Sequence, residues 1–334
     1  MKILAIETSC DDTSVALLDI TKSGFNILEN IVSSQIKVHK KWGGVVPNLA
    51  KREHQKNLPV VMNKVLKNEK PDYIAVTYGP GLEPCLWVGV NYAIELAEKI
   101  KKPIIPVNHI ESHLLANWIE SKDIKFPVMA LIVSGGHTVL VYMKGIGKYE
   151  VIGETRDDAA GECFDKIAKI LGLGYPGGPI VSKKATEFKK RKYNIQLPRP
   201  MIHQKNYDFS FSGLKTSVLY DFQSRSPKVR KSQDYIKEIC FESQEAIIDV
   251  LLKKTIKAAK DYKVKTIILG GGVVANKELR NKFEKSVQEI NLNIVFPSVE
   301  FCTDNAVMTA ITAFFNKNKA GKWKDLQANA NLKL

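Results

Sequence analysis

The chain has 334 residues, of which 44% are hydrophobic and 25% are charged. These proportions are typical of soluble globular proteins and exclude a disordered chain, a collagen and a membrane bundle. The length exceeds what one hydrophobic core usually supports, so about two domains are expected. Fifty Lys and Arg against 35 Asp and Glu give a net charge of +15, which favours an anionic partner such as nucleic acid or nucleotide phosphates.

The predicted location is the cytoplasm. Five cysteines are an odd number and lie far apart, which indicates reduced thiols rather than a disulfide framework. Glu7 and Asp11 come too early for the apolar region of a signal peptide. Residues 126–143 carry no formal charge and reach the minimum length of a membrane span, but Ser134–His137 interrupts them. Two short strands joined by a tight turn are therefore predicted there, and no membrane partner is expected.

The first predicted element is a β-hairpin, in which apolar residues 3–6 lead through a polar turn into residues 14–18. Residues 130–136 and 139–141 repeat this pattern, and both hairpin tips carry small residues that let an anion approach the backbone. A third strand, residues 266–269, meets Gly270–Gly272 and then a helical pattern from about Asn276. We predict an α/β fold of two duplicated lobes that face a central nucleotide cleft.

Helices are predicted between these strands. Apolar side chains recur every three or four residues over 160–171, with Asp157 and Asp158 before them and Gly172 as a stop, and again over 233–262. Residues 174–215 contain several prolines and are expected to be rich in loops. The expected domains are residues 1–108, residues 109–304 with the metal and nucleotide site, and a polar tail over 317–334 that frays; a helix near 305–320 could pack back on the first lobe.

His109 and His113 are the sharpest local signal. Four residues apart on a helix, their imidazoles stack on one face and can share a metal ion, although two packed or solvated histidines are an equally good interpretation. A carboxylate must complete such a site, and Asp304 is the candidate; its alternative role is the N-cap of the helix that follows. Glu111 stands one position away from where a zinc protease needs its general base, so the pattern argues against a peptidase.

Other motifs leave more than one role open. Asp11 and Asp12, at the first hairpin tip, could hold a cation, orient a nucleophile or cap the turn. The basic groups could form a track for a phosphate backbone or could be solvated surface. They comprise Lys37, Lys40 and Lys41; Lys51 and Arg52; Lys189 to Lys192; and Arg225, Lys228, Arg230 and Lys231.

Ten motifs, in order across residues 3–310, resemble those of the TsaD (Gcp) family of tRNA threonylcarbamoyladenosine transferases in its bacterial form. They are Ile6–Thr13, Gly43–Pro47, Gly79–Leu82, Asn108–His113, Val133–Thr138, Asp157–Glu162, Tyr175–Pro179, Phe211–Thr216, Gly270–Asn276 and Thr303–Ala306.

This resemblance implies an actin-like ATPase (ASKHA) fold with ligand and metal between two lobes. It implies transfer of the threonylcarbamoyl group from threonylcarbamoyl-adenylate to N6 of the adenosine 3′ of the anticodon, in tRNAs that read codons beginning with A. It also implies TsaB and TsaE as partners and TsaC as the supplier of the adenylate.

Site residues follow from the same resemblance. His109, His113 and Asp304 would hold one divalent metal, with Fe²⁺ expected and Zn²⁺ as the substitute. Asp11 would be the acidic group near the reacting carbonyl. The nucleotide ligand, threonylcarbamoyl-adenylate or ATP and ADP, would be held by Ile132, Val133, Ser134, Gly135, Gly136, Asp165, Gly178 and Asn276.

Three other functions stay open from the residues alone. A metallopeptidase is disfavoured by the position of Glu111, and a non-catalytic scaffold of the same fold is disfavoured because all three metal residues are present. A sugar-kinase-like phosphotransferase would be distinguished by phosphorylation of a small substrate.

Overall fold

The computed structural model describes residues 1–121, 123–322 and 324–334. Contacts between residues divide the chain into two compact units, which are treated separately below. The first unit combines residues 1–123 with residues 297–334, and the second unit is the continuous stretch 124–296.

A five-stranded mixed sheet forms the centre of the first unit, in the order β3-β2-β1-β4-β5. β1 pairs antiparallel with β2, and β2 with β3, whereas β1, β4 and β5 are parallel. Every residue of β1 after Lys2 is buried, because helices cover the sheet on both faces. The strands are β1 (Lys2–Glu7), β2 (Asp12–Thr21), β3 (Gly24–Ser34), β4 (Tyr73–Gly79) and β5 (Ile104–Asn108).

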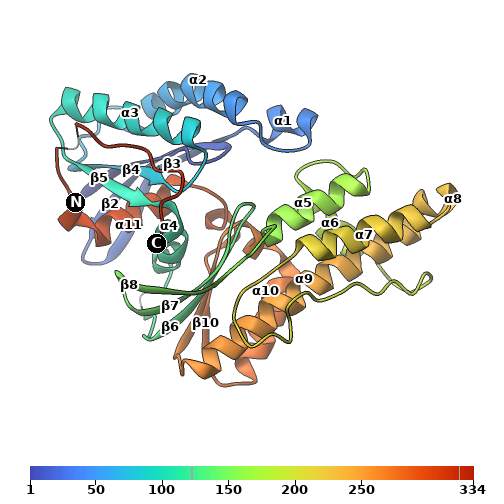
Figure 1. Ribbon diagram of the computed structural model, residues 1–334. Coiled ribbons are helices and arrows are strands. Elements are labelled where there is room, and N and C mark those ends of the chain that lie inside the picture. The colour runs from blue at the N-terminus through green and yellow to red at the C-terminus, as the bar shows by residue number, and fades with distance from the viewer. Residues whose placement is uncertain (122, 323) are drawn as a thin grey trace. The chain divides into compact units, whose positions relative to one another are not determined.

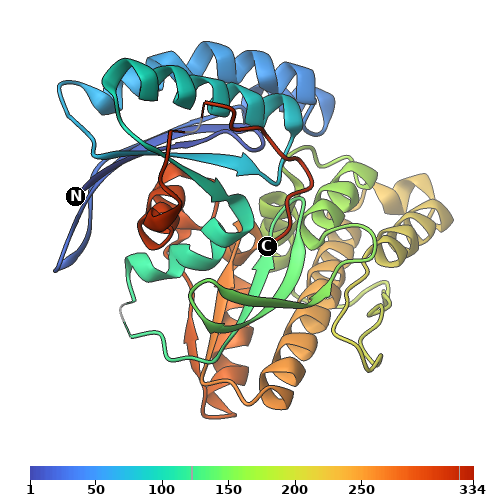
Figure 2. The same cartoon turned by 60° about the vertical axis from the view of Figure 1, so that its left-hand side comes forward.

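Helices α2 and α3 lie side by side on one face of this sheet, and α11 packs on the other face against β1 and β2 (Figures 1 and 2). α4 packs against α11. The apolar core between sheet and helices includes Leu4, Ile6, Leu58 and Val90. The helices are α1 (Ile36–His39), α2 (Pro47–Leu66), α3 (Glu83–Ile100), α4 (His109–Leu115) and α11 (Ala306–Phe315), with 3₁₀ turns η1 (Lys40–Trp42), η2 (Ala116–Ile119), η4 (Val299–Phe301) and η5 (Lys317–Lys319).

The second unit repeats this sheet. Its order, β8-β7-β6-β9-β10 when read from the hairpin side, matches β3-β2-β1-β4-β5, and β6 pairs antiparallel with β7 and parallel with β9. The predicted duplication is thus confirmed, and so is the pair of strands within residues 126–143. Among the described residues, no helix has the length and apolar character needed to cross a membrane. The strands are β6 (Val128–Val133), β7 (Thr138–Gly145), β8 (Lys148–Glu154), β9 (Thr266–Gly270) and β10 (Asn293–Val295).

The long helix α9 contacts four other helices of the second unit, α6, α7, α8 and α10, and so lies at the centre of their packing. The predictions of helices over 160–171 and 233–262 are confirmed by α5 and α9. The expected loop over 174–215 is partly wrong, because α6 begins at Gly177; Pro179 is tolerated there since the first helical turn has no N–H partners to lose. The helices are α5 (Ala160–Ile170), α6 (Gly177–Thr186), α7 (Ser212–Ser224), α8 (Pro227–Arg230), α9 (Gln233–Asp261) and α10 (Lys277–Gln288), with the 3₁₀ turn η3 (Gly272–Ala275).

Two boundaries differ from those expected. The second unit begins at residue 124 rather than 109, because α4 packs against α11 in the first unit. The polar tail does not fray: Ile104 and Gly321 exchange two backbone hydrogen bonds, and Asn329 N donates to Tyr78 O at 2.8 Å. Gly321 thus pairs with the edge strand β5 and Asn329 reaches the end of β4, contacts that sequence pattern alone does not reveal.

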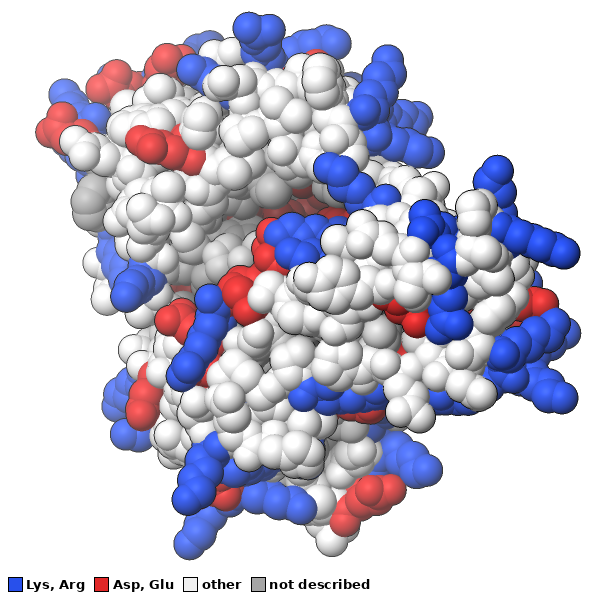
Figure 3. All heavy atoms as spheres, turned by 45° about the vertical axis from the view of Figure 1, so that its right-hand side comes forward, with Lys and Arg blue, Asp and Glu red and all other residues white. Residues whose placement is uncertain are grey.

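Lys and Arg side chains project over much of the face shown in Figure 3, as the net charge of +15 requires. Asp and Glu are visibly fewer on that face.

Candidate functional site

Helix α4 carries two imidazoles at adjacent turns. The side chain of Asn108 caps its start by accepting hydrogen bonds from Ile110 N at 2.8 Å and Glu111 N at 3.2 Å. The helix is buried along its whole length, and the ring centroids of His109 and His113 are 4.7 Å apart. The sequence spacing therefore does place both rings on one face.

Asp304 joins these rings from the segment just before α11. Its Oδ1 lies 3.1 Å from His113 Nε2 and 3.6 Å from His109 Nε2. One ligand atom from each of the three residues lies within 4.8 Å of the others. The N-cap of α11 is Asn305, whose side chain accepts from Met308 N, so the alternative role of Asp304 as the cap is wrong.

The donor set fits a divalent metal. Among the described residues, neither ring nitrogen of the buried His113 has a hydrogen-bond partner, since its 3.1 Å approach to Asp304 lacks hydrogen-bond geometry. A buried imidazole normally pairs both nitrogens, and a metal ligand is one way to satisfy such a group. Two imidazole nitrogens and one carboxylate oxygen suit the borderline metals iron and zinc and leave coordination positions open.

Glu7 supports the same site from the end of β1, and the sequence analysis missed it. Its fully buried carboxylate lies 3.1 Å from His109 Nδ1 and accepts hydrogen bonds from Ser9 N and Thr77 Oγ1, both at 2.7 Å. Burial opposes ionisation, but the neighbouring His109 ring outweighs it and lowers the pKa of Glu7. With Nδ1 occupied in this way, Nε2 of His109 faces Asp304. The only signal in the sequence was an acidic residue closing an apolar strand.

The same carboxylates hold a proton on His109. Burial favours the neutral ring, yet Asp304 and Glu7 together raise the pKa of His109 to about 9. A metal at this site would have to displace that proton, because only the neutral ring can be a ligand.

Asp11 and Asp12 lie where β1 turns into β2. Burial raises the pKa of Asp11, and the negative charge of Asp304 raises it further. The carboxylates of Asp11 and Asp304 therefore influence each other's ionisation. Burial also raises the pKa of Asp12 to about 7, and its Oδ1 has no hydrogen-bond partner in the described part of the chain. Glu111 accepts a hydrogen bond from Asn316 Nδ2 at 2.8 Å, a contact that ties its carboxylate to the end of α11.

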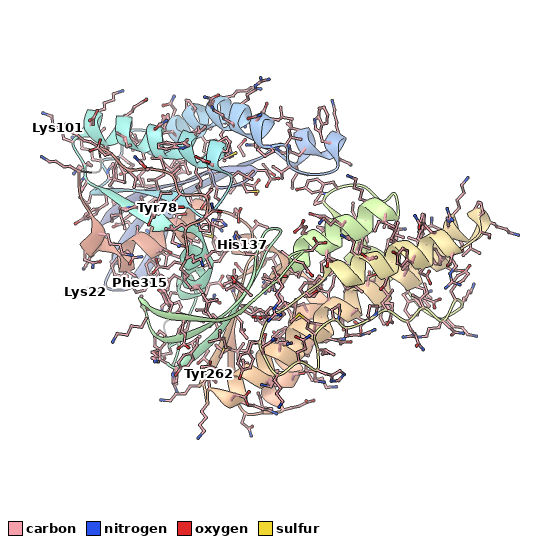
Figure 4. The ribbon with its side chains drawn as sticks, viewed as in Figure 1. Lys22, Tyr78, Lys101, His137, Tyr262 and Phe315 are labelled. Carbon is pink, nitrogen blue, oxygen red and sulfur yellow. The ribbon has the colours of Figure 1, made fainter. Side chains whose placement is uncertain are left out.

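The expected nucleotide residues all lie in the second unit. Ile132 and Val133 end β6, and the turn that follows exposes Gly135 and Gly136 beside His137, which is labelled in Figure 4. The turn packs tightly on α5: Gly161 N donates to Ser134 O at 3.2 Å, and a Cβ at Gly161 would lie 2.5 Å from that oxygen.

The three other expected nucleotide residues lie at the starts of two helices or contact one of them. Asp165 Oδ1 accepts a hydrogen bond from Gly177 N, at the first residue of α6, at 2.7 Å. This bond fixes the backbone immediately before Gly178. Asn276 caps α10 by accepting from Leu279 N and donates to Gln244 Oε1 at 2.8 Å. Because η3 contacts β6, β9 and α5, the end of β6 and the segment leading to α10 lie together. Backbone N–H groups at such helix starts favour anions.

Comparison with solved structures defines the class of fold. HypF, in its phosphate- and nucleotide-bound form, matches 95% of this chain with a TM-score of 0.59 at 12% identity, and the chain spans 55% of its length. Component A of (R)-2-hydroxyglutaryl-CoA dehydratase from Acidaminococcus fermentans matches 96% of this chain and 99% of its own, with a TM-score of 0.54 at 14% identity. The chain thus has the actin-like ATPase (ASKHA) fold, as the sequence analysis predicted.

The particular family follows from sequence. Residues 26–311 match the TsaD family, described as tRNA N6-adenosine threonylcarbamoyltransferase. A curated protein of that name from Thermosipho africanus is 48% identical over the full length of both chains, and one from Clostridioides difficile is 45% identical over 99% of this chain and 98% of its own. This chain belongs to the TsaD family.

Proposed function

We propose that this protein transfers the threonylcarbamoyl group from threonylcarbamoyl-adenylate to N6 of the adenosine 3′ of the anticodon, in tRNAs that read codons beginning with A. AMP leaves, and the tRNA gains the modified nucleoside t6A. The observation that carries this proposal is the full-length match, at 48% identity, to a curated tRNA N6-adenosine threonylcarbamoyltransferase. Because AMP is already a good leaving group, the main task of the enzyme is to hold the acyl donor and the acceptor amine close together in a reactive orientation.

His109, His113 and Asp304 would hold the metal, with Fe²⁺ as the expected ion and Zn²⁺ as its substitute. Two histidines and one carboxylate with open positions are the ligand set typical of non-haem Fe(II) sites. When bound, the metal would act as a Lewis acid toward the threonyl carboxylate or the carbamoyl carbonyl. Glu7 would keep His109 oriented with Nε2 toward the ion.

The adenylate, or ATP and ADP, would bind at the β6 turn of the second unit. Gly135 and Gly136 are exposed, and no atom of residues 1–121, 123–322 or 324–334 lies within 4 Å of the position of a Cβ on either, so a phosphate could approach their backbone closely. Ile132, Val133 and Ser134 lead into this turn, and Asp165, Gly178 and Asn276 would complete the site; Asp165 accepts from the start of α6 and Asn276 caps α10.

Asp11 would accept or orient the proton that leaves N6. Burial raises its pKa toward the range in which a carboxylate can take up a proton during a reaction. The exocyclic amine is a weak nucleophile, so positioning by Asp11 supplies part of the rate.

TsaB and TsaE are the expected protein partners, and TsaC supplies the adenylate in the cytoplasm. A peptidase is the weaker alternative, because Glu111, the only carboxylate inside the His109–His113 segment, is bonded to Asn316.

The test is mass spectrometry of nucleosides from unmodified tRNA incubated with this protein, its partners, threonine, bicarbonate and ATP. We expect t6A from the wild type, and a loss of at least a hundredfold in rate from Asp304→Asn and from His113→Ala. His203→Ala, which removes an exposed histidine of the second unit, is the matched control and should keep the wild-type rate. Absence of t6A with all components present would refute the proposal.

A further inference from the structure

We propose that tRNA phosphates bind a basic stripe on the second unit, formed by Lys189, Lys190, Lys228 and Lys231 beside the N-terminal half of α9. This inference rests on the proposed function, because it takes tRNA as the substrate. Two observations support this inference. The segments that carry these lysines are fixed to α9, and the lysine side chains themselves are left without a partner in the described part of the chain.

A buried carboxylate fixes the loop that holds Lys189 and Lys190. Glu238, on α9, is only 1% exposed and accepts backbone hydrogen bonds from Lys192 N at 2.7 Å, Tyr193 N at 3.0 Å and Ile195 N at 3.2 Å. Just before this loop, the rings of Phe188 and Phe241 stack with centroids 4.4 Å apart. The basic run is therefore bounded on both sides by contacts with α9.

Glu242, one helical turn further on, forms ion pairs with two arginines of the same segment. It accepts from Arg191 Nη2 at 3.1 Å and from Arg199 Nη1 at 2.5 Å, while Arg199 Nε reaches Asp249 at 3.1 Å. These arginines hold the loop in place, and so they are not available to a ligand in the same way as the lysines.

The segment that carries Lys228 and Lys231 is tied to the same helix. Arg225 pairs with Asp221 at 2.7 Å and lies over the rings of Tyr193 and Tyr235, 5.9 and 5.8 Å from their centroids. Tyr193 Oη also donates to Ser232 Oγ at 3.2 Å, immediately before α9. The loop, α8 and the start of α9 thus form one cluster.

Four lysine side chains around this cluster are available to a ligand. Within the described ranges, the side chains of Lys189, Lys190, Lys228 and Lys231 are exposed and have no hydrogen bond or ion pair, whereas Lys192 pairs with Asp234. Figure 3, which turns the α8 end of the second unit toward the viewer, shows Lys and Arg side chains projecting there with few acidic ones between them.

The length of the stripe suits a polyanion. The contacts that fix the basic segments to α9 run from Asp234 to Phe241, about 10 Å at the rise of an α-helix, so the lysines beside them can meet more than one phosphate of a nucleic-acid strand. A groove of about 770 Å³ beside the C-terminal half of α9 offers a contrast. There Lys257 pairs with Asp261 at 2.7 Å and Arg199 with Asp249, and the four basic side chains of the lining share it with the carboxylates of Asp249, Asp261 and Glu289, so the groove carries much less net positive charge than the stripe. The greater positive charge of the stripe therefore makes it the better candidate for binding a polyanion.

The test compares two variants that each lose four positive charges. The stripe variant is K189Q/K190Q/K228Q/K231Q, and the matched control is K148Q/K263Q/K265Q/K285Q, which removes exposed lysines elsewhere on the second unit. Binding of unmodified tRNA to the full chain, with its partners at equal concentration, is followed by fluorescence anisotropy over a series of KCl concentrations.

We expect the stripe variant to bind tRNA at least tenfold more weakly, with a slope of log K against log[KCl] smaller by about 3 in magnitude. The control should change the slope by less than 1. At saturating tRNA the stripe variant should transfer at the wild-type kcat, with the loss confined to KM for tRNA. ATP binding, which does not involve these lysines, should be unchanged.

Each outcome decides the inference. Equal slopes for the stripe variant and the control, or a wild type that does not bind tRNA, would overturn it. If the quadruple variant does not unfold cooperatively, K189Q/K190Q alone decides, with about half the change in slope expected. Failure of the proposed function itself has a separate signature, which is a wild type that binds tRNA but forms no t6A.

Discussion

At the scale of single residues, Glu7 is the side chain with the most specific expected effect on the metal. Its carboxylate lies 3.1 Å from His109 Nδ1 with no solvent exposure. A carboxylate in this position fixes the ring and makes the other nitrogen a better ligand, and removing such a partner typically costs 10- to 100-fold in metal affinity. Glu7→Gln should therefore weaken Zn²⁺ and Co²⁺ binding about tenfold or more in competition titrations. Glu69→Gln, at an exposed carboxylate that pairs with Lys2, is the control and should bind normally; equal affinities would show that Glu7 does not position His109.

Asp12 is expected to make stability depend on pH. Burial raises its pKa to about 7 in the folded protein, against about 3.9 in an unfolded chain. Between these values the folded form binds the proton more tightly, so this group's contribution to stability falls as pH rises from 4 to 7. In metal-free protein, Asp12→Asn should flatten that decline and be more stable than wild type at pH 8, by urea denaturation. Parallel pH curves for the two proteins would contradict this account.

The residues of the metal site were partly predictable. The spacing of His109 and His113 is a local pattern, and a helix necessarily places them on one face. Asp304 is far away in sequence. It is a candidate from its residue type and the resemblance implies it as a ligand, but no spacing rule connects α4 with the start of α11. Glu7 was missed because its role comes from the pairing of β1 with β4, which brings Thr77 alongside, and from the packing of α4 behind them.

At the scale of secondary-structure elements, the start of α11 links stability with metal binding. Asn305 Oδ1 accepts from Met308 N at 3.1 Å, and its Nδ2 donates to Thr303 O at 2.7 Å. Asn305→Ala should lower the free energy of unfolding by about 1 kcal/mol and should weaken metal binding, because Asp304 immediately precedes the cap. Asn305→Ser keeps the capping oxygen and should restore most of the stability in urea titrations. Normal metal affinity in the alanine variant would mean that other contacts hold Asp304.

Gly271 should control the nucleotide site through the backbone. Its φ is +94°, and an added Cβ would lie 2.4 Å from Val133 O. Gly271→Ala should therefore push away the end of β6 and reduce ADP affinity at least tenfold in calorimetric titrations. Gly147→Ala is a matched control, with φ of +75° and no atom within 4 Å. It should lose about 1 kcal/mol of stability from strain and bind ADP normally. Equal binding by both variants would separate Gly271 from the site.

Elements with strong periodicity were predictable, and those fixed by tertiary contacts were not. Both hairpins, α5 and α9 follow from alternation or from three- and four-residue spacing. α6 was expected to be a loop because Gly177, Gly178 and Pro179 suggest a turn, yet Asp165 on α5 accepts from Gly177 N and so satisfies one of the unpaired N–H groups at the start of α6. The tail pairs with Ile104 and Tyr78 through backbone groups, which leave no trace in side-chain pattern.

At the scale of the whole molecule, the return of the C-terminal chain explains why the first unit is discontinuous while the second is continuous. Both sheets have the same strand order, but the helix that covers one face of the first sheet, α11, comes from the far end of the chain. A linear reading of the sequence sees the hairpins repeat and places a boundary between them. It cannot see that the chain returns after residue 296 to complete the first unit.

This difference predicts unequal behaviour of the two halves. Residues 124–296, expressed alone, contain a complete sheet and the helices that pack on it, and should unfold cooperatively in urea and bind ADP. Residues 1–123 alone lack α11, whose buried face includes Val307, Met308 and Ile311, so β1 and β2 would expose their apolar side chains to water. That fragment should aggregate or show no cooperative transition, and joining residues 297–334 to it through a flexible linker should restore one. A cooperative transition of residues 1–123 without α11 would show that the first unit's core does not depend on the returning chain.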